Sequence, residues 1–358
     1  MVMLRFLTAG ESHGPCLTAI LEGLPAGLRI DGIRVNQEMA RRQEGFGRGG
    51  RMKIERDHAD FLSGIRFGET LGSPLTLRIT NADWVNWETK MSAFGEKVGP
   101  VVTAPRPGHA DLTGCQKYDR EDVRDILERA SARETASRVA VGAVCRQLLE
   151  RCGIHVQSRV VSIGGAEDVA EQEALIAAAK AAGDTLGGCF EVTATGVMPG
   201  LGSHIQWDRR LDGKIAAALV SIPAIKGVEF GAGFACGVLP GSKIHDEIFY
   251  SEERGYYRAT NRAGGIEGGM SNGETIVLRA VMKPIPTLTR PLSTVDILTR
   301  KSVEANSERS DVCAVGAAAY VGEAMLCIVL CTELLDKFGS DSVGELLSAV
   351  ANYREKLG

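Results

Sequence analysis

The chain has 358 residues, of which 44% are hydrophobic and 24% are charged, which fits one large domain or two modest ones. Its net charge of −4 provides no overall positive field, and this argues against a nucleic-acid-binding or membrane-surface protein. The nine cysteines form no C-x-x-C pair and no zinc-spaced cluster with histidine, so we expect no metal site.

The first 80 residues alternate short apolar runs with turn signals. They predict a strand within 3–10, a second within 16–30, an amphipathic helix over 34–45 that stops at Gly45, and successive antiparallel strands over 51–80. No apolar run of signal-peptide length opens the chain, and we therefore expect a cytoplasmic protein.

The clearest helical pattern runs from Asp119 to Gly153. It has acidic residues in its first turn, no internal proline and a glycine at its C-terminal end. As one continuous helix it would place Arg129 and Arg133 on the same face, with Ser131 between them. Its centre, RASARETASRVAVGAV, is rich in alanine, serine and glycine, so another element could pack closely against it.

The second half of the chain alternates strands with a few long helices. We expect helices over 167–183, 208–222 and 317–339 and strands over 189–202, 226–234 and 274–285. The run AMLCIVLCTELL inside the last helix is broken by an acidic residue and is too short to span a bilayer. Grouped strands without a regular βαβα order predict an α+β fold in a single domain over 1–358.

Two glycine motifs match known signatures but lie in the wrong context. Gly10 to Gly14 (GESHG) fits the G-x-S-x-G nucleophile elbow, yet it follows the first strand of the chain and is followed by proline. Gly45 to Gly50 (GFGRGG) fits G-x-G-x-x-G, but it follows a helix instead of opening one. We therefore expect neither an esterase nor a dinucleotide-binding fold.

The glycine-arginine loop is the most basic part of the chain. Arginine forks bind carboxylate and phosphate, and glycines expose backbone N–H groups, so the loop suits an anionic ligand. A solvated basic turn and an RNA-binding segment are the alternatives from the residues alone. The positive residues are Arg41, Arg42, Arg48, Arg51, Lys53 and Arg56, against Glu44 and Glu55.

Two histidines, His13 and His109, stand beside glycine in polar loops, and they suggest acid–base chemistry near neutral pH. A structural histidine is the alternative for each. Asp311 precedes the last predicted helix and could be only its N-cap.

Taken together, seven segments resemble the chorismate synthase family. They occur in that family's order between residues 8 and 311, so the resemblance covers nearly the whole chain. The segments are TAGESHGP, RRQEGFGRGGRMKIE, PRPGHADL, RASARETASRVAVGAV, GGIEGGMSNGE, MKPIPTL and ERSD.

The resemblance implies an activity and a cofactor. Chorismate synthases are carbon–oxygen lyases that convert 5-enolpyruvylshikimate 3-phosphate to chorismate and phosphate, the last step of the shikimate pathway. The reaction is a 1,4-anti elimination that needs reduced FMN (FMNH2). The family fold is a β-α-β sandwich with helices between antiparallel sheets, and its members are homotetramers.

The resemblance also implies roles for individual residues. His13 would protonate the departing phosphate, His109 would protonate reduced flavin near N1, and Asp311 would recover the proton from flavin N5. Ser12 and Ser131 would help to relay protons or to orient bound groups, so Ser12 would be a hydrogen-bonding residue and not a nucleophile. The substrate-binding residues would be Arg42, Arg48, Arg51 and Arg133, and the cofactor-binding residues would be Arg129, Ala130, Ser131, Pro223, Ala224, Gly268, Lys283, Pro284, Ile285, Pro286, Thr287 and Arg309.

Other functions stay open at this level. A flavin-free enzyme acting on phosphorylated sugar acids would use the same arginines and histidines. Some family members reduce their own flavin with NADPH, but this chain has no recognisable reductase domain, and we expect reduced flavin to come from outside.

Overall fold

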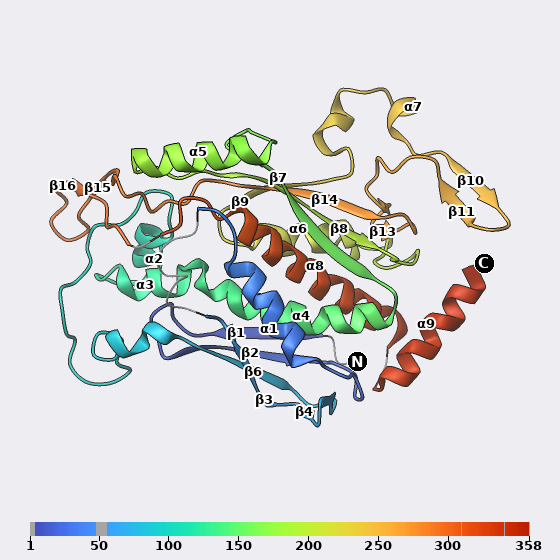
Figure 1. Cartoon of the computed structure of the whole chain (residues 1–358), viewed down its shortest axis with the longest axis horizontal. Helices are drawn as coiled ribbons and strands as arrows, with labels where there is room; N and C mark the ends of the chain where they lie inside the picture. Colours follow the sequence, from blue (N-terminus) through green and yellow to red (C-terminus); the bar gives the residue numbers. More distant parts are fainter. Residues whose placement is uncertain (1–3, 48–55, 309, 340, 358) are drawn as a thin grey trace.

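The computed structural model describes residues 4–47, 56–308, 310–339 and 341–357, and the elements in these ranges form two antiparallel sheets with helices between them (Figure 1). The first sheet has the strand order β1 (Arg5–Ala9), β2 (Cys16–Glu22), β6 (Leu75–Thr80), β3 (Ala59–Ser63). The second has the order β7 (His155–Ile163), β8 (Gly188–Thr195), β14 (Ile276–Met282), β9 (Ile225–Phe230). The α+β sandwich predicted from the sequence is confirmed.

The remaining strands form short antiparallel pairs outside the two main sheets. The pairs are β4 (Ile65–Arg66) with β5 (Glu69–Thr70), β10 (Ile248–Ser251) with β11 (Gly255–Arg258), β12 (Ile266–Glu267) with β13 (Met270–Ser271), and β15 (Ser293–Val295) with β16 (Ser302–Glu304). Figure 1 shows the β10–β11 hairpin projecting from one end of the molecule.

The helices fall into an inner layer and a set of outer elements. Between the sheets lie α1 (Gly32–Gln43), α4 (Thr135–Arg151), α6 (Leu211–Val220) and α8 (Val315–Phe338) (Figure 1). The outer elements are α2 (Asp111–Tyr118), α3 (Arg124–Ala130), α5 (Val169–Ala182), α7 (Gly241–Ile244), α9 (Val343–Leu357) and the 3-10 turns at Ala82–Asn86, Ala132–Glu134, Trp207–Arg209 and Gly233–Gly237.

The sheets follow from side chains that alternate between two faces. In β14, Leu278, Ala280 and Met282 are buried, while Arg279 and Val281 between them are exposed. A strand with this period of two presents one apolar face to a core and the other to solvent. The buried faces of both sheets cover the helical layer and share one hydrophobic core with it.

Helix α8 is the apolar centre of this core. By length and composition it could cross a membrane, but 83% of its most hydrophobic window is buried inside the protein. A helix that is apolar on all sides suits a position between two sheets, where every side meets another element.

Helices α4 and α8 approach each other closely at a glycine. A Cβ placed on Gly142 of α4 would lie 2.4 Å from the Cβ of Ala324 and 2.8 Å from its carbonyl oxygen. The small residues predicted to permit close packing in this helix therefore do so at Gly142.

Replacing Gly142 with alanine is expected to lower the free energy of unfolding by about 1–3 kcal/mol, because α4 and α8 must separate to admit the methyl group. Gly316 of α8 is the matched control, since a Cβ there meets nothing within 4 Å and alanine should be neutral or slightly stabilising. Urea denaturation of both variants measures the difference, and equal midpoints would contradict this account of the packing.

The prediction of one helix from Asp119 to Gly153 is wrong. Helix α3 ends at Ala130, and α4 begins only at Thr135. Ser131 between them is extended (φ −65°, ψ 140°), and its side-chain oxygen accepts a hydrogen bond from the Arg133 backbone N–H. A serine that caps a new turn in this way competes with a continuous helix. Arg129 and Arg133 consequently do not share a helix face.

The other predicted helices and strands within the described residues are present, but β2 and β8 end at Glu22 and Thr195, earlier than predicted. The elements that were not predicted are α2, α7, α9, β7, the β10–β11 hairpin and the short pairs β12–β13 and β15–β16. Asp311 is not a helix cap, since α8 begins at Val315 and Ala314 occupies the cap position. Gly153 does follow the end of α4, and its φ of +72° is the left-handed conformation expected there.

Candidate active site

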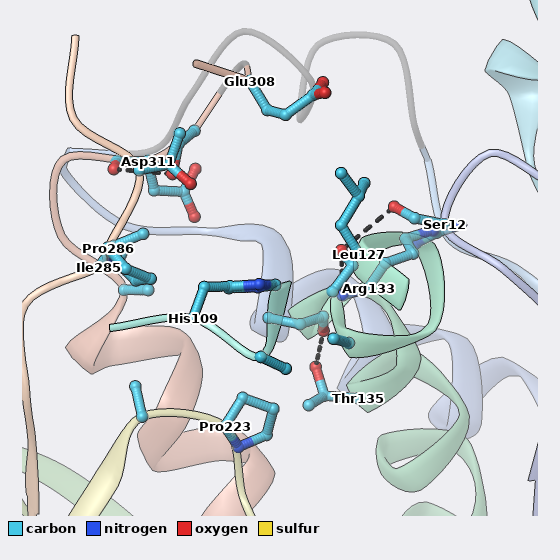
Figure 2. Close-up of a pocket in the computed structure, with 18 of the residues that line it drawn as sticks. Ser12, His109, Leu127, Arg133, Thr135, Pro223, Ile285, Pro286, Glu308 and Asp311 are labelled. Atoms are coloured by element: carbon cyan, nitrogen blue, oxygen red, sulfur yellow. Dashed lines mark hydrogen bonds between the residues drawn. The ribbon is translucent and has the colours of Figure 1, made fainter. Parts of the chain in front are cut away.

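A cavity of about 620 Å³ lies where the loop after β1, helix α3, the segment after β14 and the segment before α8 meet. Figure 2 shows His109 between Asp311, Ile285 and Pro286 on one side and Ser12 and Arg133 on the other. Fourteen of the residues predicted for the site line this cavity: Ser12, His13, Arg42, His109, Ala130, Ser131, Arg133, Pro223, Ala224, Lys283, Ile285, Pro286, Thr287 and Asp311.

His13 is held by the turn that follows β1. Gly10 has a φ of +106°, and a Cβ there would lie 2.4 Å from the carbonyl oxygen of Cys16, so only glycine permits this turn. The ring of His13 stacks on Trp87, with centroids 4.0 Å apart, and its Nδ1 lies 2.9 Å from Glu128 Oε1. His13 is thereby fixed at the cavity wall.

His109 is held by a second carboxylate. Its Nδ1 is hydrogen-bonded to Asp111, which is fully buried. Arg106 donates from Nε to the same carboxylate at 2.8 Å, and its Nη1 donates to Thr287 Oγ1 at 3.0 Å. Burial alone would raise the pKa of Asp111, but the hydrogen bonds from His109 and Arg106 hold it well below the usual range.

Two of the predicted substrate-binding arginines converge on one carboxylate. Arg42 donates to Asp57 at 2.6 Å, and Arg133 bonds to the other oxygen of Asp57. Arg133 also donates to Asn81 at 2.9 and 3.0 Å. All four side chains are buried, and the two arginines line the cavity. Asp57 orients the arginines and neutralises part of their charge.

One arginine nitrogen in this cluster has unused hydrogen-bonding capacity. The buried Nε of Arg42 meets no hydrogen-bond acceptor within the described part of the chain. A buried donor without a partner is costly unless a ligand or water supplies one. Arg42 lines the cavity and carries a guanidinium, so the cavity suits an anionic ligand at this residue.

The two predicted serines meet in the cavity wall. Ser12 Oγ donates to Ser131 Oγ at 3.1 Å, and the Ser12 backbone N–H donates to the carbonyl oxygen of Glu128 at 3.1 Å. Ser131 reaches this position because the helix is interrupted there. The described contact of the Ser12 hydroxyl is thus with another serine, whereas the nucleophile of a hydrolase is paired with a base such as histidine.

The cavity wall opposite Ser12 and Arg133 is mostly apolar and carries the cation Lys283. Ile222, Pro223, Ala224, Met282, Ile285 and Pro286 line it. Lys283 Nζ donates to the Gly108 carbonyl at 2.8 Å, and burial together with the charge of Lys226 lowers its pKa. Ala224 has a φ of +71°, and its carbonyl oxygen accepts the Lys283 backbone N–H, so this wall is a fixed backbone surface. An apolar wall beside a cation suits an aromatic ring system carrying a negative group.

Some predicted residues lie elsewhere. Arg129 ties α3 to β1 by donating to the carbonyl oxygens of Thr8 and Gly10 and does not line the cavity. Gly268 lies in the turn between β12 and β13, outside the cavity lining. Pro284 follows β14 and does not line the cavity either. Arg48, Arg51 and Arg309 lie outside the described residues.

The sequence reasoning missed most of the residues that hold the site together. Arg106 and Asp111 flank His109 in the quoted PRPGHADL segment, so that segment carried a usable signal. Asp57, Asn81, Trp87 and Glu128 come from separate parts of the chain, and nothing in their local sequence marks them. Within the described ranges, no group of three or more His, Cys, Asp or Glu residues is arranged to hold a metal ion.

Comparison with known proteins gives consistent matches. The chorismate synthase family model matches residues 4–335. A chorismate synthase from Geobacter sulfurreducens is 54% identical, with 99% of each chain covered, and one from Caldanaerobacter subterraneus is 57% identical, with 96% of each covered. A crystal structure of a chorismate synthase superimposes with a TM-score of 0.81 at 44% identity, over 100% of this chain and 99% of that one.

Proposed function

Since the chain belongs to the chorismate synthase family, whose lyases form chorismate in the last step of the shikimate pathway, we propose that its cavity binds 5-enolpyruvylshikimate 3-phosphate together with reduced FMN. The observation that carries this proposal is the meeting of two histidines, two serines and buried arginines in one cavity beside an apolar wall. The substrate has two carboxylates and a phosphate, and Arg42 and Arg133 supply cations for such groups.

The residues present fit a flavin. The apolar wall around Pro223, Ala224 and Ile285 would hold an isoalloxazine ring, and Lys283 and Arg106, which also line the cavity, would supply positive charge. The cavity volume lies within the range of about 300–1,000 Å³ found for small-molecule sites. When bound, reduced FMN supplies electron density that helps to expel phosphate and takes up the hydrogen lost from the ring.

The chain's own residues then bind, orient and exchange protons. His13 donates a proton to the departing phosphate, since a proton reduces the charge that develops on the leaving group. His109, held by Asp111, keeps a proton beside the flavin, and Asp311 accepts a proton at the same side of the cavity. Ser12 and Ser131 orient the bound molecules by hydrogen bonds.

An anaerobic assay tests this function. Supplied with 5-enolpyruvylshikimate 3-phosphate and chemically reduced FMN, the protein is expected to form chorismate and phosphate in equal amounts. Absence of both products, with FMN bound, would contradict the proposed substrate. The same assay in air with NADPH and oxidised FMN is expected to give no product, because we propose that reduced flavin comes from outside.

Replacing Ser12 with alanine is expected to lower kcat about 10-fold, the order of a lost hydrogen bond, because the Ser12–Ser131 contact is removed. No covalent intermediate is expected in the wild type, and mass spectrometry during turnover checks this. An acyl- or phospho-adduct on Ser12 would make it a nucleophile and refute its proposed role.

We further propose a homotetramer of single-domain subunits, spanning residues 1–358, in the cytoplasm and independent of nucleic acid and membranes. The independence from membranes is supported by helix α8, the one apolar helix of spanning length among the described residues, because it is mostly buried in the core. Light scattering on the purified protein measures the oligomeric state directly.

A further inference from the structure

We propose that Glu128 is the positioning residue of His13: it holds a hydrogen on Nδ1 and so presents Nε2 to the cavity. The inference rests on the proposed function of His13 as a proton donor. It concerns a residue that binds neither substrate nor flavin in that function.

Glu128 contacts His13 at two places. Its carboxylate accepts the His13 backbone N–H at 2.8 Å, and its two oxygens lie 2.9 and 3.0 Å from the ring Nδ1. The side chain of Glu128 is only 2% exposed, so water does not compete for these bonds. Its main-chain carbonyl accepts the backbone N–H of Ser12 as well.

The carboxylate is ionised in this position. Burial by itself would raise the pKa of Glu128, but hydrogen bonds and charge from His13, together with the hydrogen bond from Arg124, hold it below its usual value. Arg124 donates to Glu128 at 2.8 Å and to Glu308 at 2.9 Å. An ionised carboxylate only accepts, so Nδ1 must carry the hydrogen; a bare Nδ1 would direct its lone pair at two oxygens.

The face of the ring is fixed too. Trp87 stacks on His13 with an interplanar angle of 22°, and its indole N–H donates to Asp83 at 3.2 Å. The guanidinium of Arg124 lies 4.9 Å from the Trp87 ring centroid. With one edge held by Glu128 and one face by Trp87, the imidazole cannot turn, and Nε2 is the nitrogen left for the substrate.

The positioning role makes a prediction that simple anchoring of the loop does not. In water, the neutral histidine ring carries its hydrogen mainly on Nε2. A neutral His13 with its hydrogen on Nδ1 would therefore show that the Glu128 carboxylate determines the tautomer. Glu128→Gln keeps the shape and an acceptor oxygen for the backbone N–H, but it removes the charge. Asp125 is the matched control on the same helix, because it is exposed and pairs with Arg120 at 2.6 Å.

The experiment is ¹⁵N NMR of histidine-labelled full-length protein at alkaline pH, with the His13 signal assigned from His13→Ala, alongside the anaerobic assay. We expect wild type and Asp125→Asn to show hydrogen on Nδ1. In Glu128→Gln the population with hydrogen on Nε2 should dominate, and kcat should fall about 10- to 100-fold with little change in KM.

The outcomes separate the hypotheses. Hydrogen on Nε2 in the wild type, or an unchanged tautomer in Glu128→Gln, overturns the proposal even if activity falls, since the loss would then come from loop anchoring. If Glu128→Gln unfolds, Trp87→Leu is the second variant: it removes the stacking but keeps the carboxylate, so hydrogen must remain on Nδ1. A changed tautomer in a protein that makes no chorismate would support the positioning role and contradict the proposed function.

Discussion

Replacing His13 with alanine is expected to lower kcat for chorismate formation about 100- to 10,000-fold, the range for loss of a general acid. His13 lines the cavity, and Glu128 and Trp87 fix its ring there. Substrate binding should change little, because the buried arginines remain. Anaerobic single-turnover assays with reduced FMN separate the loss in kcat from any change in substrate affinity.

His58 is the matched control for this prediction. It is 66% exposed, pairs with the surface residue Asp60 and does not line the cavity, so His58→Ala should retain wild-type turnover. If His13→Ala lost less than threefold, or lost no more than His58→Ala, His13 would not be the proton donor to phosphate.

Replacing Asp57 with asparagine is expected to lower the free energy of unfolding by about 3–5 kcal/mol, the cost of breaking a buried ion pair by removing one partner. Asp57 lies between Arg42 and Arg133, and the three side chains are almost completely buried. Two guanidiniums would then face each other without a carboxylate between them. Urea denaturation measures this loss, and inorganic phosphate should recover part of it by binding the arginines.

The pKa of Asp57 predicts how the stability lost in Asp57→Asn depends on pH. Burial by itself would raise the pKa of Asp57, but Arg42 and Arg133 lower it below its usual value of 3.8. The stability that Asp57 contributes is therefore complete above about pH 4–5 and is lost as pH falls through the lowered pKa. The difference in free energy of unfolding between wild type and Asp57→Asn should therefore narrow as the pH falls from about 4–5 through the lowered pKa of Asp57.

Asp60 provides the comparison for Asp57. It lies on β3, only three residues away, and pairs with Arg78 at the surface. Asp60→Asn should cost no more than about 1 kcal/mol because solvent screens an exposed pair. Equal losses for the two variants would show that burial does not set the energy of the Asp57 cluster.

The sequence by itself determined the elements whose physical cause is local. The alternating strand β14, the apolar helix α8 and the glycine end of α4 each follow from periodicity or from a backbone conformation that one residue type permits. His13 and His109, which line the cavity, were also singled out from the sequence, because glycine and acidic neighbours mark a loop suited to acid–base chemistry.

The error at Ser131 shows where local reasoning ends. Helix propensity over Asp119–Gly153 is high, and no proline or glycine stands next to Ser131 to signal an interruption at that position. The interruption is stabilised by tertiary contacts: Ser12 bonds to Ser131, and Arg133 reaches Asp57 and Asn81. Those contacts join segments more than fifty residues apart, so a pattern read within a few turns does not contain them.

Only the tertiary structure decided which charges control the site. Asp57 and Glu128 are ordinary acidic residues in the sequence. Asp57 acquires its role by being buried against Arg42 and Arg133 from other elements, and Glu128 by being buried against His13 from the loop after β1 and Arg124 of its own helix. Burial removes the water that would otherwise screen these charges, so a carboxylate can orient an arginine or a histidine. Local sequence specified the reactive groups, whereas packing of distant segments specified the groups that hold them in place.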